Sequence, residues 1–271
     1  MLTAVTRRVA DRVPISFPRA LGVYEALRYP ETGTLEWMRR HALLIGWLEQ
    51  VRNEVGASHL VVLDFGGASG SLRSALRLYR RQSNYSFLVA DVDTEALEAV
   101  PEDERIRLYP EGTLPLGDAS VDVVVSSDVF EHIPQGWRAH WAAELHRVTR
   151  LGQAHTFPAD SRDGRWASTE ADRALDAWFR ETFGRPERWT AEHLASPEPV
   201  VEEMVALFPG ASVVGFGNVE VWGEMLRDQL APASAPRRLA FAVQYLLSRR
   251  AADHRPPWKG ALLTVRTRSG R

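Results

Sequence analysis

A glycine-rich segment with acidic residues around it is the part of this sequence whose residue types and spacing best suit ligand binding. The segment runs from Asp64 to Gly70 as Asp-Phe-Gly-Gly-Ala-Ser-Gly, after an apolar run and before apolar residues at helical spacing. Glycines at such a turn let backbone N–H groups and a helix N-terminus approach a ligand closely. The alternative is a purely structural turn between a strand and a helix.

The spacing of this loop narrows the class of ligand. A phosphate-cradling loop would end in Gly-Lys-Ser/Thr, and the segment contains no lysine. A dinucleotide fingerprint G-x-G-x-x-G would need glycine where Ala68 and Ser71 stand. The pattern that fits is Asp64-x-Gly66-x-Ala68-x-Gly70.

A second acid, Asp91, ends the next apolar run, about twenty residues past the loop, where a carboxylate can accept hydrogen bonds from both hydroxyls of a ribose. Two other roles are open for it, a solvated loop residue or a helix cap. Asp91-Val-Asp93 also spells the D-x-D that binds metal–diphosphate in many glycosyltransferases. Its position after the second strand of a glycine-loop unit favours the ribose role.

The stretch from Leu114 to Pro134, LPLGDASVDVVVSSDVFEHIP, is the most specific segment of the chain. It resembles the L-P-F-x-D-x-S-F-D-x-V-x-S-x-x-V-L-E-H-I stretch of class I S-adenosylmethionine-dependent methyltransferases, in their small-molecule, type 11-like branch. The glycine loop resembles motif I of that family, D-x-G-x-G-x-G, and residues 144–152 resemble its E-x-x-R-V-L-x-P-G. The departures are Ala68 for the middle glycine and Leu151 for the proline. The resemblance covers about residues 59–158.

This resemblance implies a Rossmann-like fold, S-adenosyl-L-methionine as cofactor and an enzyme that transfers a methyl group. It places the end of the fourth strand at the methionine part of the cofactor and an E-H pair near its reactive end. His132 is therefore the leading candidate for a catalytic residue. The implied cofactor-binding residues are Asp64, Gly66, Gly67, Gly70, Asp91, Val92, Glu111, Ser127 and Asp128.

Methyl transfer from a sulfonium is an in-line displacement, in which orientation of the reactants supplies much of the catalysis. A hydroxyl acceptor also needs a general base, and histidine suits neutral pH. The E-H pair containing His132 has the alternative role of anchoring its loop, and His155, His193 and Asp160 are weaker candidates for the base. No metal is required, and the sequence shows no evident metal-ligand spacing. His140 and Glu144, four residues apart, are better explained as a solvated helix face.

The elements that must position these residues alternate between strand and helix, which predicts a parallel sheet covered on both faces. The expected fold class is α/β, a Rossmann-like, doubly wound and mostly parallel seven-stranded sheet with an inserted helical lobe and a helical N-terminal extension. Strands are expected over 59–64, 85–90, 106–109, 121–125, 212–216 and 261–265, and helices over 35–51, 72–79, 94–100, 137–149, 200–208 and 239–249.

Four parts of the chain follow from this pattern: an N-terminal extension (1–58), the cofactor-binding core (59–158), an inserted lobe (159–197) and the remainder of the core (198–271). The lobe is rich in tryptophan among charged residues, and it interrupts the chain after the fifth strand. Ligands of such folds bind at that edge of the sheet. We therefore expect the lobe to cover the acceptor site as a mobile lid. A fixed packing lobe and a dimer contact are the alternatives.

Composition limits which other binding functions and cellular locations are compatible with the sequence. The 271 residues carry a formal net charge of −2, which argues against nucleic-acid binding through a broad basic surface. The chain contains no cysteine, and no apolar run is long enough for a signal peptide or a membrane span. We expect a soluble, cytoplasmic protein without membrane insertion, for which a homodimer is compatible with the sequence.

The expected function is methyl transfer to a small-molecule, sugar or glycan acceptor, with oxygen as the expected site of methylation. Natural product or polysaccharide biosynthesis is the setting this chemistry suits. Two alternatives belong to other classes: a protein that binds S-adenosylmethionine without turnover, and a metal-dependent nucleotide-sugar glycosyltransferase built on Asp91 and Asp93.

Overall fold

The computed structural model describes residues 34–78, 82–110, 112–195, 197–230 and 255–267. Several of the expectations above fall wholly or partly outside these residues; the helix over 72–79 loses only its last residue, and the lobe loses residue 196. The others are the cofactor role of Glu111, the helix over 239–249 and the first 33 residues of the N-terminal extension. Within the described residues, no helix is long and apolar enough to cross a membrane.

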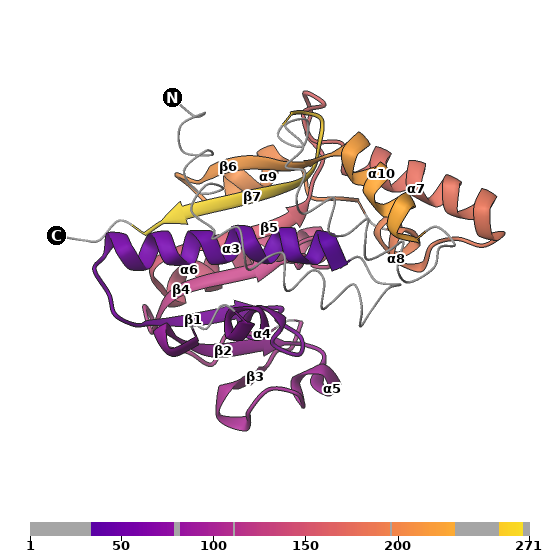
Figure 1. Cartoon of the computed structure of the whole chain (residues 1–271). Helices are drawn as coiled ribbons and strands as arrows, with labels where there is room; N and C mark the ends of the chain where they lie inside the picture. Colours follow the sequence, from indigo (N-terminus) through magenta and orange to yellow (C-terminus); the bar gives the residue numbers. More distant parts are fainter. Residues whose placement is uncertain (1–33, 79–81, 111, 196, 231–254, 268–271) are drawn as a thin grey trace.

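A seven-stranded sheet forms the centre of the molecule (Figure 1), in the order β3-β2-β1-β4-β5-β7-β6. The first five strands in this order run parallel, and β7 is antiparallel to both β5 and β6. This confirms the expected α/β, Rossmann-like, mostly parallel sheet. The strands are β1 (Leu60–Phe65), β2 (Tyr85–Asp91), β3 (Arg105–Arg107), β4 (Val121–Ser127), β5 (Thr149–Pro158), β6 (Ser212–Asn218) and β7 (Trp258–Arg266).

Helices cover both faces of the sheet. On one face α3 and α4 pack against Val123 and Val125 of β4, and on the other α6 and α9 pack against Val121 and Val124. Burial on both faces explains why the central strands are almost wholly apolar. The helices are α3 (Thr34–Glu54), α4 (Ser71–Leu78), α5 (Thr94–Leu97), α6 (Gln135–Val148), α7 (Ser168–Phe183), α8 (Arg188–His193), α9 (Val201–Leu207) and α10 (Val219–Leu230), with 3₁₀ turns at Gln82–Asn84 and Glu102–Glu104.

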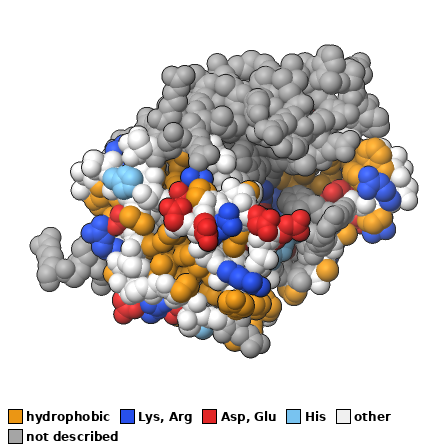
Figure 2. All heavy atoms as spheres, turned by 90° about the horizontal axis from the view of Figure 1, so that it is seen from below, with side chains coloured by type: hydrophobic (Ala, Val, Ile, Leu, Met, Phe, Trp, Pro, Cys, Tyr) orange, Lys and Arg blue, Asp and Glu red, His pale blue; other side chains and the backbone are white. Residues whose placement is uncertain are grey.

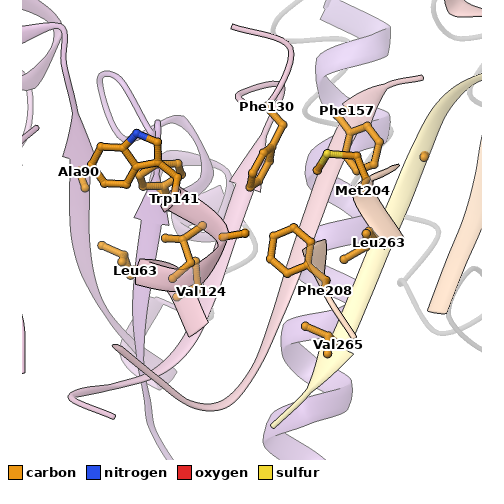
Figure 3. Close-up of a cluster of buried hydrophobic side chains, with 14 of the residues drawn as sticks. Leu63, Ala90, Val124, Phe130, Trp141, Phe157, Met204, Phe208, Leu263 and Val265 are labelled. Carbon is orange, nitrogen blue, oxygen red and sulfur yellow. The ribbon is translucent and has the colours of Figure 1, made fainter. Parts of the chain in front are cut away.

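The hydrophobic cluster beneath α6 and α9 combines aliphatic side chains with several aromatic ones (Figure 3). Trp141 of α6 lies against Phe65 with ring centroids 5.2 Å apart, and Phe130 meets Phe208 edge to face at 5.6 Å. Phe130 lies in the loop that follows β4, so this packing fixes the start of the loop that carries His132.

The helix α10 is the main element that the sequence pattern did not predict. Its start is specified by Asn218, whose Oδ1 accepts hydrogen bonds from the backbone N–H groups of Glu220 and Val221, at 3.1 and 3.2 Å. Asparagine is a strong N-cap, and here it ends β6 and begins the helix without a loop. The helix expected over 94–100 is shorter in the structure, where α5 ends at Leu97.

The expected lobe consists of α7 and α8, and it lies against α10 at one end of the molecule (Figure 1). The buried side of α7, which includes Ala171, Leu175 and Phe179, faces this contact and β7. Trp166 joins the start of the lobe to the sheet, since its Nε1 donates a hydrogen bond of 3.2 Å to the carbonyl of Gly260.

The surface mixes both signs of charge. On the face shown in Figure 2, acidic and basic side chains are interspersed with hydrophobic ones. This arrangement agrees with the formal net charge of −2 over the whole chain.

Candidate functional site

The carboxyl ends of β1, β2 and β4 meet at one edge of the sheet, and the glycine loop lies there. The backbone N–H of Gly66 donates to the carbonyl of Ala90 at 2.7 Å, and that of Ala68 donates to the Asp91 carboxylate, also at 2.7 Å. The loop after β1 and the acid that ends β2 are thus held together. The sequence placed both features correctly at this edge.

Three backbone positions show why the loop is rich in glycine. Gly66 has a φ of +71°, and a Cβ there would lie 2.3 Å from the Val129 side chain. A Cβ on Gly67 would lie 2.6 Å from the Asp64 carboxyl carbon. Gly70 has a φ of +75° and no such close neighbour, so its backbone conformation is what favours glycine there.

Ala68 occupies the position where the family motif has its middle glycine, and its φ is +45°. A residue with a side chain loses roughly 1–2 kcal/mol in this left-handed region. The departure from the motif therefore adds local strain to the loop.

Asp64 is buried at the base of the loop, and its Oδ2 has no hydrogen-bond partner among the described residues. Burial and, to a smaller extent, the nearby negative charge of Asp91 raise the pKa of this carboxyl to about 7. A buried carboxylate without a donor suits a ligand that brings a positive charge or a hydrogen-bond donor. The loop therefore fits a cofactor with an amino-acid ammonium group and a ribose.

Asp91 and Asp93 have different surroundings. The Asp91 carboxylate accepts from the N–H groups of Ala68 and of Asp93, the latter at 2.9 Å, which directs it toward the glycine loop. Asp93 is the cap of α5, since its Oδ1 accepts from Glu95 N and Ala96 N. The cap role left open for Asp91 thus belongs to Asp93. With Asp93 committed to the helix, a metal–diphosphate site built on both acids loses its support.

The loop after β4 is tied to the helix α3. Asp128 has a φ of +54°, its N–H donates to Thr156 O at 2.9 Å, and its carboxylate forms an ion pair with Arg40 of α3. One residue on, His41 lies 3.1 Å from the hydroxyl of Ser71 at the start of α4. The first half of α3 therefore contacts the loops after both β1 and β4. The sequence predicted this helix but gave no sign of these tertiary contacts.

A second group of polar residues, which we call the buried ionic cluster, lies where the loop after β4 meets the lobe. It comprises Glu131, His132, Asp172, His193, Glu198 and Lys259. Asp172 forms an ion pair of 2.9 Å with Lys259, and the Nδ1 of His193 lies 3.5 Å from carboxylate oxygens of both Asp172 and Glu198. All of these residues except His132 are buried. The cluster joins β7, the loop after β4 and both lobe helices.

Burial and neighbouring charges shift the pKa values of the residues in this cluster in different directions. Burial raises the pKa of Glu131 to about 8. Burial would also raise the pKa of Asp172, but the charges of Lys259 and His193 outweigh it and hold that pKa below its usual value. Burial acts to lower the pKa of His193, and its contacts with the carboxylates of Asp172 and Glu198 outweigh this and raise it.

His132 and His193 come together although they are 61 residues apart in the chain. Their rings meet edge to face with centroids 5.7 Å apart, and the His132 ring is exposed. The sequence named each as a candidate base but could not place them side by side. It missed Asp172, Glu198 and Lys259, because their contacts are made across the interface between lobe and sheet.

The other candidates for the base have structural partners. His155 is buried within β5, where Ser126 Oγ lies 2.8 Å from its Nδ1, and burial lowers its pKa to about 3. Asp160 accepts hydrogen bonds from the N–H and the hydroxyl of Thr169 at the start of α7. Both side chains are committed to holding strands and helices in place.

The expectation of a solvated helix face for His140 and Glu144 is wrong. His140 Nε2 lies 2.8 Å from the carbonyl of Gly112, and Glu144 accepts from Leu114 N at 3.0 Å. Glu144 also pairs with Arg147, at 2.8 Å. These side chains of α6 fix the segment that leads into β4, a contact that no spacing within the helix could reveal.

Comparison with known proteins identifies the core. Residues 63–156 match the family model described as "Methyltransferase domain". An uncharacterised methyltransferase of Mycobacteroides abscessus is 31% identical over 148 residues, 49% of this chain and 54% of that protein. One from Mycobacterium sp. (strain JLS) is 36% identical over 114 residues, 41% of this chain and 43% of that protein. The chain thus spans about half the length of these relatives or less.

A solved S-adenosylmethionine-dependent methyltransferase from Archaeoglobus fulgidus is also similar, with 11% identity, a TM-score of 0.46 and coverage of 81% of this chain and 92% of that one. This likeness is too weak to carry an argument. The domain match agrees with the sheet order and the loop geometry described above. Residues 63–156 are similar to a methyltransferase domain, and the relatives that share this part of the chain are named methyltransferases.

Proposed function

We propose that this protein transfers the methyl group of S-adenosylmethionine to an oxygen of a small-molecule, sugar or glycan acceptor. The observation that carries the proposal is the sheet edge where the glycine loop, Asp91 and the partnerless Oδ2 of Asp64 lie together. When bound, the cofactor supplies a methyl group on a sulfonium, from which a neutral thioether can leave.

The cofactor would be held largely by backbone. The backbone of the loop at Gly66, Gly67 and Gly70 can lie close to it because no side chain intervenes. Asp91 would accept hydrogen bonds from the ribose hydroxyls, as the position of its carboxylate beside the loop supports. Asp64 has the buried carboxylate that an ammonium group would satisfy.

Two further contacts belong to this proposed arrangement. Val92, which is exposed directly after Asp91, offers an apolar surface to the base. Ser127 and Asp128, at the end of β4, would lie by the methionine part. The ion pair of Asp128 with Arg40 would keep that loop in place when the cofactor enters.

An acceptor hydroxyl must lose its proton as its oxygen bonds to the methyl carbon and the carbon–sulfur bond breaks, with the electron pair remaining on sulfur. We propose that His132 takes part in removing this proton. Two features support the assignment: its ring is exposed, and it follows the same strand, β4, that would face the methionine part. The buried ionic cluster behind the ring supports its position.

Binding and turnover need separate tests. Calorimetry should show S-adenosylmethionine or its demethylated product binding to the protein, and failure of both to bind would overturn the proposal. Mass spectrometry of hydroxyl-bearing acceptors incubated with protein and cofactor should show the gain of one methyl group. Binding without any methylated product would favour the alternative of a protein that holds the cofactor without turnover.

A substitution at His132 tests its role against a matched control. H132Q should retain cofactor affinity and lose activity by about 10²–10⁴-fold, the usual contribution of a positioned acid–base group. H146Q changes an exposed histidine on the outer side of α6 and should retain both. Equal activity of the two variants would remove His132 from the reaction.

A further inference from the structure

The buried ionic cluster has more carboxylate than its hydrogen bonds account for. Both oxygens of Glu131, Oδ1 of Asp172 and Oε2 of Glu198 are buried without a hydrogen-bond partner among the described residues. Each of the three residues is less than a tenth exposed. A buried carboxylate oxygen without a partner is costly, and a cation or a proton must relieve it.

The cations near these oxygens have other partners. Lys259 pairs with Asp172, and Arg138, which is buried, donates its hydrogen bonds to the carbonyls of Ile133 and Pro197. Arg40 also acts on Glu131, and it forms an ion pair with Asp128.

Two imidazoles and one carboxylate come together beside these unpartnered oxygens. One possible ligand atom from each of Glu131, His132 and His193 lies within 4.8 Å of the other two. Metal–ligand bonds of about 2.0–2.2 Å would draw these atoms closer together.

From this geometry we propose that Glu131, His132 and His193 bind a divalent transition-metal ion, for which zinc is the best match. Two histidines and one glutamate with an open fourth position form a ligand set typical of catalytic zinc. Asp172 and Glu198 lie 3.5 Å from Nδ1 of His193, as carboxylates commonly lie behind a metal-binding imidazole. An ion bound at Nε2 of His193 would leave these contacts intact.

The location of the site suggests its use. Glu131 and His132 belong to the loop after β4, whereas His193 ends α8 in the lobe, so the ion would join the lobe to the core. Resting on the proposed function, the open position would accept the acceptor oxygen, and the ion would lower the pKa of its hydroxyl so that the proton passes to water. His132 would then act on the acceptor through the ion.

Zinc binding can be measured without any assay of methyl transfer. Protein stripped with a chelator, dialysed against zinc chloride and analysed by mass spectrometry of the metal should hold one zinc per chain. Cobalt in place of zinc should give a visible absorption band that reports on its ligands. E131Q, which keeps the size of the side chain, and H132Q, at an exposed position, should each weaken zinc binding by at least about tenfold. H146Q is the matched control and should bind like the unchanged protein.

Absence of bound zinc and cobalt, or retention of zinc by both E131Q and H132Q, would overturn the site. Cofactor calorimetry on the same stripped protein separates this outcome from the proposed function. Cofactor binding with no metal binding would reject the metal site alone. Metal binding with no cofactor binding would reject the proposed methyl transfer and leave the site standing.

Discussion

At the scale of single residues, what could be predicted depended on whether a side chain acts through its neighbours in sequence. The glycine loop and Asp91 were found from spacing, because a strand, a turn and a helix place them regardless of the rest of the chain. The partners of His132 were not found. His193 meets its ring, and Asp172 and Lys259 lie behind His193, only through the packing of the lobe on the sheet.

Asp91 gives the sharpest prediction at this scale. D91A should weaken binding of the cofactor by about 1.5–3 kcal/mol for each charged hydrogen bond lost, or roughly 10–150-fold. The physical reason is that the carboxylate both accepts from the loop at Ala68 and would accept from the ribose. Calorimetric titration of the folded variant measures the effect.

Asp93 is the control for this change. D93A removes the cap of α5 and should lower the free energy of unfolding by about 1 kcal/mol while the dissociation constant stays within a few-fold. An unchanged dissociation constant in D91A, or the same loss in D93A, would show that Asp91 serves only the loop.

At the scale of elements, hydrophobic patterning predicted the central strands because they are buried on both faces. It failed where an element is specified by one side chain or by another part of the chain. The helix α10 begins at the cap formed by Asn218, and α3 finds its role through Arg40 and His41, whose partners lie in two separate loops. Neither fact has a periodic signature.

The strand β5 carries a buried histidine that should make stability depend on pH. His155 has a pKa lowered to about 3 by burial, whereas an exposed histidine has a pKa of about 6.5. The unfolded chain therefore takes up a proton below pH 6.5 that the folded chain refuses until about pH 3. The stability that the neutral ring contributes is fully present above pH 6.5, and it is lost as the pH falls toward 3.

Urea unfolding at pH 7.5 and 5.5 measures this effect. The free energy of unfolding should fall by about 1.4 kcal/mol more in the unchanged protein than in H155N, which cannot take up the proton. Raised carboxyl pKa values at Asp64 and Glu131 act in the opposite sense, and they cancel in the comparison because both proteins contain them. Parallel pH profiles for the two proteins would show that the buried ring is not the cause.

At the scale of the whole molecule, the lobe is bound to the core more extensively than a freely moving lid over 159–197 would be. Its first half is fixed by the hydrogen bond from Trp166 to Gly260, by the ion pair of Asp172 with Lys259 and by the packing of α7 on α10. Past the left-handed Gly184 that ends α7, the polar contacts to the core that the structure describes are those of His193 and Glu198 and the hydrogen bond from Arg138 to the Pro197 carbonyl.

We therefore predict that motion of the lobe is confined to residues 184–197 and that ligands suppress it. Arg188 offers trypsin a site in this segment, whereas the bond after Arg185 precedes a proline. Arg173 and Arg180, both exposed on α7, are internal controls. Cleavage after Arg188 should be fast in the protein alone and several-fold slower with cofactor and acceptor product, because bound ligands stabilise the closed state by mass action.

Cleavage within α7 should be slow in both states, since it requires the helix to leave its packed and ion-paired face. The fragments are identified by mass. Equal rates after Arg188 with and without ligands would show a fixed lobe, and cleavage after Arg180 as fast as after Arg188 would show that the whole lobe opens.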